Sequence, residues 1–504
     1  MSSIGRSVTT ALIFYWAALV QQGLYDPRFE HDACGVGFVA RVSAEPSHEL
    51  LQMALEALSR LAHRGAVAAD GRSGDGAGIT TSIPRRIFGS FLADCGFNLA
   101  ADLPLGVGML FVEPEELAAV PIHLISAIEG QGLKLLCWRE VPINLGALGK
   151  TALSSMPVIR QAIIVPEASI DASEFEARLH RARKHFERAN LKSYVASLSS
   201  RTIVYKALCA GAQLREFYCD LQDQNFEASF VLFHQRYATN THPSWWLAQP
   251  FRLLAHNGEI NTIGANRTWM KARAAELPPE FLPLLREGGS DSCHLDEAAE
   301  LLLRSGRDLL HSVAMLLVPA WQAHPAFHDL TSFYREHAAM MEPWDGPAAI
   351  AFADGRYVGA ALDRNGLRPL RYKVTVDGLV TVGSEVGLFD SNDDTVEVKG
   401  RLGPGQMLAV DLKRHEVLDA EKLRRHLFKA TPRQHSHVVA IERAPATQVA
   451  TPSEQVHALF GYTREDLKLV IAPMARDGKE AVWSMGDDTP VSALARVPRS
   501  VYTY

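Results

Sequence analysis

The chain has 504 residues, enough for two or more domains, and its 47% of hydrophobic residues provides for a sizeable buried core. Its formal net charge is −6, and its 51 basic and 57 acidic residues are interspersed, so no basic stripe indicates nucleic-acid binding. The six cysteines are widely scattered, with no CxxC pair and no Cys/His spacing that suits zinc. We therefore expect a reducing cytoplasm and no structural metal.

An apolar run occupies residues 11–20 near the start of the chain. It is shorter than the ~20 apolar residues of a membrane-spanning helix, so no membrane segment is predicted. Its length suits a secretory signal peptide, but the Gln-Gln-Gly-Leu sequence at 21–24 is a poor cleavage site. We therefore favour a removable pro-segment over residues 1–33, with a signal peptide as the alternative.

Cys34 begins a run of glycine and apolar residues that predicts a buried strand over residues 34–40, and a small residue, Ala33, precedes it. If the bond between Ala33 and Cys34 were cut, Cys34 would carry both a thiol and a free α-amine. An amine with a pKa of about 7.7–8 can act as base for a thiol with a pKa of about 8.5. The alternative is an ordinary buried strand cysteine.

A helix is predicted over residues 49–61 because its leucines recur at helical spacing. A glycine-rich loop at 70–78 follows and leads into a predicted strand at 79–83. This loop lacks the Lys-Ser/Thr pair of a phosphate-binding loop and does not match GxGxxG, so no nucleotide site is predicted there.

The later elements form groups of strands with helices between the groups, which favours a layered α+β domain over a doubly wound one. Strands are predicted at 105–112, 230–233, 253–255, 348–352, 357–362, 379–383 and 407–410, and helices at 113–129, 173–190, 261–275 and 294–304. This domain is expected to occupy residues 34–429. Residues 430–453 are expected to form a linker, and residues 454–504 the incomplete start of a second domain.

An Asn257-Gly258 pair follows the predicted strand at 253–255. Such a pair is first of all a turn signal, because glycine, and asparagine less easily, tolerates positive φ. The functional interpretation is an oxyanion hole made by the Asn257 side-chain N–H and the Gly258 backbone N–H. The residues alone leave both interpretations open.

Two charged residues stand beside predicted elements. Arg236 follows the strand at 230–233, where it is either a structural charge or a bidentate ligand for a substrate carboxylate. Asp291 lies in a Ser-Asp-Ser sequence before the helix at 294–304, where it is either part of a helix cap or a ligand for a substrate ammonium group.

Seven motifs, taken together and in order, resemble the class II (N-terminal nucleophile) glutamine amidotransferase domain of the glutamate synthase large subunit. The resemblance covers about residues 25–423, and residues 460–490 resemble the start of that enzyme's central domain. The motifs are Cys34-Gly35-Val36-Gly37-Phe38, His63-Arg64-Gly65-Ala66, Gly74-Asp75-Gly76-Ala77-Gly78, His234-Gln235-Arg236-Tyr237-Ala238-Thr239, His256-Asn257-Gly258-Glu259, Ser290-Asp291-Ser292 and Asp363-Arg364-Asn365-Gly366-Leu367-Arg368-Pro369.

The resemblance implies a four-layer αββα sandwich and the hydrolysis of L-glutamine to glutamate and ammonia. Cys34 would be the nucleophile, Asn257 and Gly258 the oxyanion hole, and Arg236 and Asp291 the ligands of the glutamine carboxylate and ammonium groups. One departure is Cys293, where many members have Glu or Gln after Ser-Asp-Ser.

In the complete family enzyme, the ammonia passes to 2-oxoglutarate to form a second glutamate. FMN and an iron–sulfur cluster are expected only in the synthase region, which is missing here, so no cofactor is expected in this chain. A separate synthase half and the glutamate synthase small subunit are possible partners, whereas neither nucleic acid nor membrane is expected. Two alternatives remain open, a different N-terminal-cysteine amidohydrolase and a catalytically silent assembly or regulatory subunit.

Overall fold

The computed structural model describes residues 34–97, 103–236, 242–322, 325–390, 393–430 and 453–478. The chain divides into two compact units, Met1–Gln434 and His435–Tyr504. The predicted pro-segment lies outside the described residues, as does the predicted linker apart from its end residues 430 and 453.

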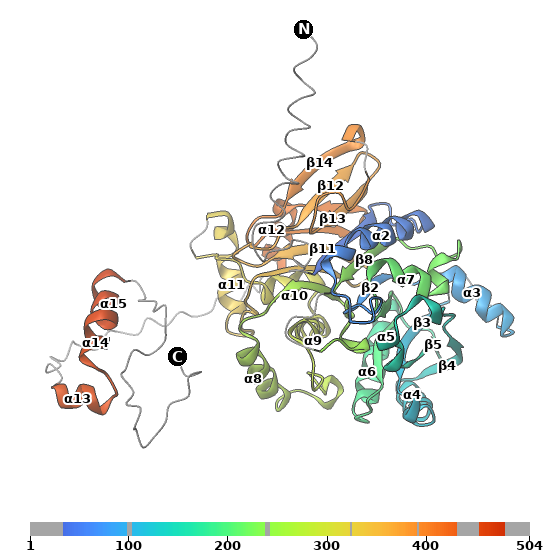
Figure 1. Ribbon diagram of the computed structural model, residues 1–504, viewed down its shortest axis with the longest axis horizontal. Coiled ribbons are helices and arrows are strands. Elements are labelled where there is room, and N and C mark those ends of the chain that lie inside the picture. The colour runs from blue at the N-terminus through green and yellow to red at the C-terminus, as the bar shows by residue number, and fades with distance from the viewer. Residues whose placement is uncertain are drawn as a thin grey trace, which may run out of the picture. The chain divides into compact units, whose positions relative to one another are not determined.

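Two antiparallel sheets form the centre of the first unit (Figure 1). The described strands of one sheet run in the order β14 (Val396–Arg401), β12 (Arg371–Thr375), β13 (Leu379–Gly383), β1 (Gly35–Arg41), β8 (Phe230–Gln235), β2 (Ala77–Ser82) and β7 (Thr202–Ala207). Those of the other run β16 (Glu416–Leu418), β15 (Met407–Asp411), β11 (Tyr357–Leu362), β10 (Ala348–Ala353) and β9 (Leu254–Gly258).

The two sheets pack face to face. Alternate residues of each strand point to the same side, so one set lies between the sheets and the other set faces outward. In β10, Ala349, Ala351 and Ala353 belong to an apolar cluster that also contains Val36 and Phe38 of β1. The residues between them in β10 belong to a second cluster, which is made with helices. Small alanines on the inner face therefore let the sheets approach, and the other face of β10 packs on helices.

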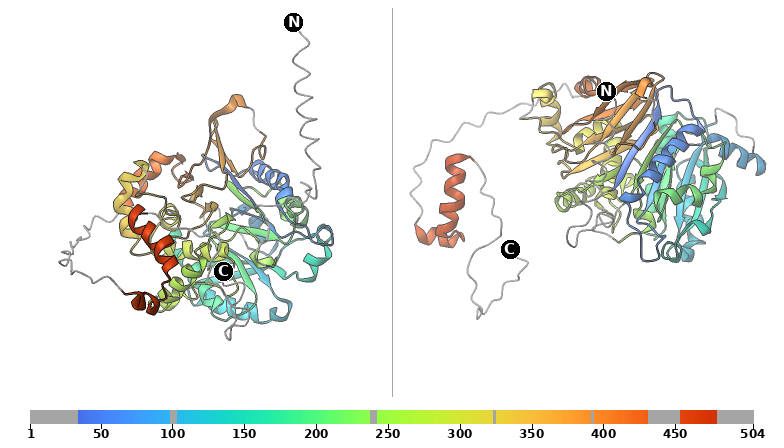
Figure 2. Two further views of the ribbon diagram at one scale, coloured as in Figure 1. Left: turned by 60° about the vertical axis from the view of Figure 1, so that its left-hand side comes forward. Right: turned by 45° about the horizontal axis from the view of Figure 1, so that its top comes forward.

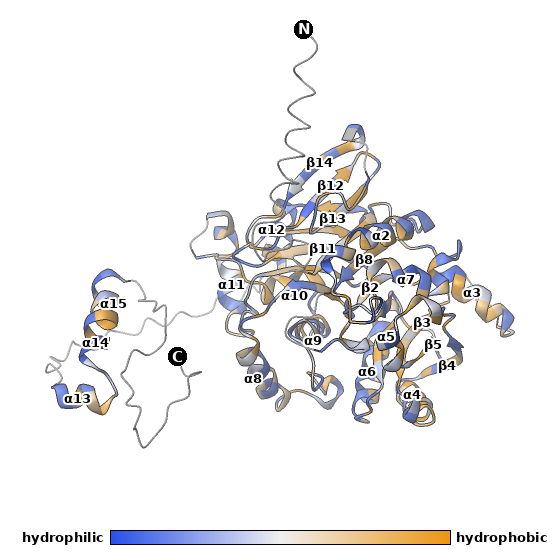
Figure 3. Ribbon diagram, in the orientation of Figure 1, coloured by the Kyte–Doolittle hydropathy of each residue, from blue (hydrophilic) through white to orange (hydrophobic). Residues whose placement is uncertain are grey.

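Helices cover the outer face of each sheet, which gives the predicted αββα order of layers (Figure 2). On the seven-stranded sheet these are α2 (His48–Arg60) and α7 (Gly211–Phe217). On the five-stranded sheet they are α8 (Ile263–Ala274), α9 (Asp291–Arg304), α10 (Leu309–Leu316), α11 (Thr331–His337) and α12 (Ala420–Ala430). Hydropathy follows this layering, with apolar residues along the strands and polar residues in the loops (Figure 3).

The chain segment between β2 and β7 forms a third sheet, of which the sequence pattern predicted only the strand at 105–112. Its described strands run in the order β4 (Leu133–Glu140), β5 (Val158–Pro166), β3 (Gly106–Val112) and β6 (Tyr194–Ser199). The helices α4 (Ala119–Glu129) and α6 (Ala172–Glu187) pack on it through an apolar cluster of their own. The same segment contains two short helices, α3 (Arg85–Asp94) before β3 and α5 (Lys150–Ser154) between β4 and β5.

The helix predicted over 113–129 is wrong at its beginning. A 3-10 turn covers Pro114–Glu116, and α4 begins only at Ala119. Pro121 explains the late start, because a proline is tolerated in the first turn of a helix but disrupts its interior. A helix from residue 113 would have placed Pro121 in its interior.

The second unit is described by itself over residues 453–478. It contains α13 (Glu454–Leu459), α14 (Arg464–Asp466), a π turn at Leu467–Ile471 and α15 (Ala472–Asp477). None of the helices in the described parts of the chain has the length and apolar character needed to cross a membrane.

Candidate active site

The beginning of β1 and the end of β9 meet across the sandwich. The side-chain Nδ2 of Asn257 donates a hydrogen bond to the backbone carbonyl oxygen of Cys34 at 2.6 Å. Cys34 is half-buried, whereas Asn257 is buried. An amide nitrogen has two N–H groups, so the second N–H of Asn257 remains for another acceptor.

Strand β9 continues through Asn257 and Gly258, so the prediction of a loop after residue 255 is wrong. Gly258 has φ = 123°, and a Cβ built on it would lie 1.8 Å from the carbonyl oxygen of Pro347. Only glycine fits this position. The Asn-Gly pair is therefore a distorted strand end rather than a hairpin turn.

The hydrogen-bond pattern of β10 determines the direction in which the backbone N–H of Gly258 points. The backbone N–H and C=O of Ala348 are both engaged by Asp363, which lies on the β11 side. In an antiparallel ladder the next residue, Ala349, therefore faces β9, where it stands opposite Asn257. The N–H of Gly258 then points away from β10, at the edge of the sheet that β9 forms.

Arg236 follows β8 and is only 5% exposed, which excludes a surface charge. Its backbone N–H donates to the carbonyl oxygen of Gly76 at 2.8 Å, so the glycine-rich loop holds the end of β8. Burial lowers the pKa of Arg236, while the charges of Cys34, Asp75 and Asp291 act to raise it. These three groups therefore lie close enough to the guanidinium to interact with it electrostatically.

Asp291 is the first residue of α9, and the preceding Ser290 provides the cap by accepting the N–H of Cys293 at 3.1 Å. The Asp291 carboxylate accepts the backbone N–H groups of Ile260 at 3.0 Å and Ser292 at 2.7 Å. Burial would raise its pKa, but nearby His256 and these hydrogen bonds hold the pKa below 3.8. Asp291 is thus an ionised carboxylate near the end of β9.

A buried polar network holds the strand residue before Asn257. His234, His256 and Ser292 belong to motifs quoted above without a role, and the sequence did not single out Gln249. Gln249 accepts the backbone N–H of His256 at 2.7 Å and donates to the His256 carbonyl oxygen at 3.2 Å. The Nδ1 of His256 lies 2.9 Å from the Ser292 hydroxyl, and the Nε2 of His234 lies 3.1 Å from the His256 carbonyl oxygen. Burial lowers the pKa of His234 to about 3, so that ring is neutral.

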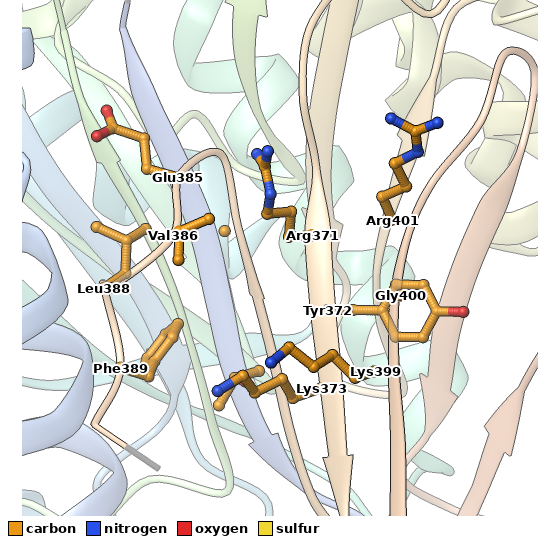
Figure 4. Close-up of a pocket in the computed structure, with 13 residues that line it drawn as sticks. Arg371, Tyr372, Lys373, Glu385, Val386, Leu388, Phe389, Lys399, Gly400 and Arg401 are labelled. Atoms are coloured by element: carbon orange, nitrogen blue, oxygen red, sulfur yellow. The ribbon is translucent and has the colours of Figure 1, made fainter. Parts of the chain in front are cut away.

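His63 and Arg64 both contact Glu385, in the loop that follows β13. His63 Nε2 lies 2.9 Å from a carboxylate oxygen of Glu385, and Arg64 pairs with the other oxygen. Glu385 lines a groove of about 370 Å³ at the β12–β14 edge (Figure 4). Two cation pairs stand directly opposite one another on these strands, Arg371 with Arg401 and Lys373 with Lys399.

Within the described residues, no group of three or more His, Cys, Asp and Glu side chains is arranged to hold a metal ion. The six cysteines are free thiols. Among them Cys34 is half-buried, whereas Cys209 and Cys293 are buried, and burial raises the pKa of both buried thiols.

Comparison with known proteins identifies both parts of the chain. The family model of the class-II glutamine amidotransferases matches residues 34–435, and the model of the glutamate synthase central domain matches residues 455–504. The first match begins at Cys34 and covers most of the chain.

Curated relatives are similar along nearly the whole chain. The ferredoxin-dependent glutamate synthase 2 of Synechocystis sp. is 40% identical over 94% of this chain and 32% of the relative. The large chain of the NADPH glutamate synthase of Azospirillum brasilense is 40% identical over 97% of this chain and 34% of the relative, and that of Bacillus subtilis 38% over 96% and 33%. The chain thus spans about a third of the length of these relatives, and it belongs to the class II glutamine amidotransferase family.

Proposed function

We propose that this chain hydrolyses L-glutamine to glutamate and ammonia, with Cys34 as the nucleophile. The observation that carries the proposal is the hydrogen bond from Asn257 to the Cys34 carbonyl oxygen, beside the outward-facing N–H of Gly258. The contact supports the proposal because it joins the strand end that carries the Asn257-Gly258 pair to the backbone of Cys34.

In the proposed reaction, residues 1–33 are removed and the α-amine of Cys34 takes the proton of its own thiol, directly or through one water. The thiolate attacks the glutamine side-chain carbonyl carbon. The second N–H of Asn257 and the N–H of Gly258 stabilise the resulting oxyanion. In comparable sites, removal of one such donor raises the activation free energy by about 3–4 kcal/mol. The amine then returns the proton to the departing ammonia, and water hydrolyses the thioester.

The charged groups of the site suit the backbone of a free amino acid. Arg236 provides a planar fork for the α-carboxylate, and Asp291 provides a carboxylate for the α-ammonium group. Both are buried enough for these charges to act with little screening, yet Asp291 keeps 27% of its side chain exposed. A substrate without an amino acid backbone would use neither.

We place this reaction within glutamate synthesis because the relatives are named glutamate synthases and the central-domain match follows the amidotransferase match. The ammonia would pass to 2-oxoglutarate in a synthase region outside the 504 residues, where FMN and an iron–sulfur cluster would supply the electrons. A synthase half, the glutamate synthase small subunit and a location in the cytoplasm are part of this proposal.

Labelling with an electrophilic glutamine analogue tests the proposal. The full chain is incubated with the analogue, digested and analysed by mass spectrometry together with its N-terminal sequence. We expect one covalent equivalent on Cys34 in chains that begin at residue 34. The exposed thiols Cys95 and Cys219 are internal controls. Glutaminase activity in chains that keep residues 1–33, or labelling at either control cysteine, would contradict the proposal.

A further inference from the structure

Asp363 begins the last of the seven sequence motifs, and the proposed reaction gives it no role. It follows β11 directly and is only 2% exposed. Strands β10 and β11 pair as far as Ala349 and Leu362, so the next residues along the two strands are Ala348 and Asp363. Ala348 also stands opposite Gly258 of β9. Asp363 and Gly258 therefore flank the same residue of β10 from opposite sides.

The side chain of Asp363 replaces a backbone acceptor that a regular ladder would provide. In a regular antiparallel pair, each of the two residues donates its N–H to the carbonyl oxygen of the other. One of these bonds is present, from the Asp363 N–H to the Ala348 oxygen at 3.0 Å. The Asp363 carbonyl oxygen instead accepts the N–H groups of Gly366 at 3.2 Å and Gly405 at 2.8 Å. The Ala348 N–H donates to Oδ1 of the Asp363 carboxylate at 3.2 Å.

The other carboxylate oxygen of Asp363 is held by its own loop. Oδ2 accepts the backbone N–H of Asn365 at 2.8 Å and its side-chain N–H at 2.9 Å. The loop therefore orients the carboxylate, and the carboxylate holds the first residue of β10. Ala348 is fully buried, so removal of the carboxylate would leave a buried donor without this acceptor.

The bond to Asp363 also sets the direction of the neighbouring carbonyl group. The C=O of Pro347 and the N–H of Ala348 belong to one trans peptide unit, so they point in opposite directions. Because the N–H is directed to Asp363, the Pro347 oxygen is directed to β9. A Cβ built on Gly258 would lie 1.8 Å from this oxygen, which also accepts the Glu259 N–H at 3.4 Å.

This close packing leaves Gly258 little freedom to move independently. Its φ of 123° lies in the region that glycine alone adopts readily. A second close approach lies beside it, since a Cβ built on Gly346 would be 2.0 Å from the Glu259 carbonyl oxygen. A rotation of the Pro347–Ala348 peptide would therefore displace Gly258 and redirect its N–H.

We infer that Asp363 is a positioning residue for glutamine hydrolysis, which holds the Pro347–Ala348 peptide and through it the Gly258 N–H. The inference rests on the proposed function, in which this N–H stabilises the oxyanion. A displaced donor weakens the transition state, where charge develops on the oxygen, more than it weakens substrate binding. Asp363 should therefore act on kcat rather than on KM.

Steady-state hydrolysis of glutamine by the full chain and by Asp363→Ala tests the inference. We expect kcat to fall about tenfold or more and KM to change by less than about twofold. Asp363→Asn keeps one oxygen acceptor and should recover part of the lost kcat.

Inhibition gives a second readout that does not depend on turnover. An aldehyde analogue of glutamine adds the Cys34 thiol, and its adduct places an oxygen at the proposed oxyanion hole, whereas glutamate forms no adduct. Asp363→Ala should bind the aldehyde about tenfold more weakly and bind glutamate as the unsubstituted chain does.

The matched control is Asp411→Ala, at the other end of β11. Asp411 is 1% exposed, stands opposite Tyr357, and accepts the backbone N–H groups of Lys413 at 3.0 Å and Arg414 at 3.1 Å. Its loss should lower the unfolding temperature much as Asp363→Ala does. It should leave kcat and the affinity for the aldehyde unchanged.

The outcomes separate the inference from the proposed function. An unchanged kcat in Asp363→Ala, or an equal loss of kcat in Asp411→Ala, would overturn the inference and leave the proposed function standing. If Asp363→Ala does not fold, Asp363→Asn decides: a lower kcat with unchanged KM supports the inference, and an unchanged kcat overturns it. An unsubstituted chain that hydrolyses no glutamine would overturn the proposed function and the inference together.

Discussion

The first turn and the middle of helix α9 use the same kind of side chain in opposite ways. At its beginning, Asp291 keeps 27% of its side chain exposed, and hydrogen bonds together with His256 hold its pKa low despite burial. Five residues later, Asp296 is fully buried, and burial raises its pKa to about 6 although Leu253 and Leu254 donate backbone N–H groups to it. One carboxylate stays charged and accessible, and the other is enclosed.

This difference separates function from stability along one helix. The accessible first turn carries Asp291, whose charge acts on Arg236 and which is proposed to bind the substrate. The enclosed middle of the helix joins a buried ionic network with α6, in which Arg183 pairs with Glu187 and Glu300. There a substitution leaves an uncompensated charge inside the protein.

The largest expected effect is at the accessible side. Cys34→Ser should reduce glutamine hydrolysis by roughly 10⁴-fold or more, because a hydroxyl is a far weaker acid than a thiol and the α-amine scarcely activates it. The midpoint of urea unfolding should not change. Steady-state ammonia release and urea denaturation measure the two quantities. A Cys34→Ser variant that keeps its activity, or that loses unfolding free energy as well as activity, would contradict the separation of function from stability.

In the buried network, Arg183→Met should lower the free energy of unfolding by about 3–5 kcal/mol, since it leaves Glu187 and Glu300 buried without their arginine. The KM for glutamine of the folded fraction should stay the same. The matched control is Arg425→Met, which breaks an exposed pair with Glu421 and should cost less than about 1 kcal/mol. Equal losses in the two variants would show that the buried network is not structural.

Sequence alone predicted the parts that leave a local pattern. Short continuous apolar runs indicated strands such as β10 and β11, and the Ser-Asp-Ser sequence marked the start of α9. The roles assigned to the site residues came from motif resemblance and remain proposals. Partners distant in sequence left no such signal: Arg183 and Glu300 are 117 residues apart, and nothing local marks Gln249 as the support of the strand before Asn257.

Asn257→Ala should lower kcat by about 10²–10³, because its amide is proposed to act on the charge that develops in the transition state. The structure adds a second reason, since the same amide holds the Cys34 carbonyl oxygen. The KM should change little. Presteady-state measurement of thioester formation separates the steps, and a loss confined to KM would reassign Asn257 to substrate binding.

Glu297 provides a pH test of the enclosed middle of α9. It is 4% exposed, and burial raises its pKa to about 7, above the 4.5 of an unfolded chain. The folded state therefore holds the proton more tightly, and this stabilisation is complete below pH 4.5 and is lost as the pH rises through about 7.

Glu297→Gln resembles the protonated form at every pH. Relative to it, the unsubstituted protein should lose about 1–3 kcal/mol of unfolding free energy between pH 4.5 and 7. Urea denaturation across this range measures the difference, with exposed Glu421→Gln as the flat control. A difference that grows as the pH falls would reverse the sign and contradict the buried state of Glu297.

The smallest expected effect is that of Arg236→Lys, which keeps the charge at the accessible side but removes the fork. A lysine ammonium is a point charge that cannot bind both oxygens of a carboxylate in one plane. Because the proposed contact is present in both the ground state and the transition state, KM should rise about tenfold, or about 1.4 kcal/mol, while kcat changes little. The backbone N–H that binds Gly76 is retained, so β8 keeps its end and stability should not fall.

Steady-state kinetics with two substrates distinguish the cause: glutamine, and the glutamine analogue whose α-carboxylate is replaced by an amide. The variant should lose affinity for glutamine and not for the analogue. An equal loss for both would mean that Arg236 positions Cys34 rather than the substrate.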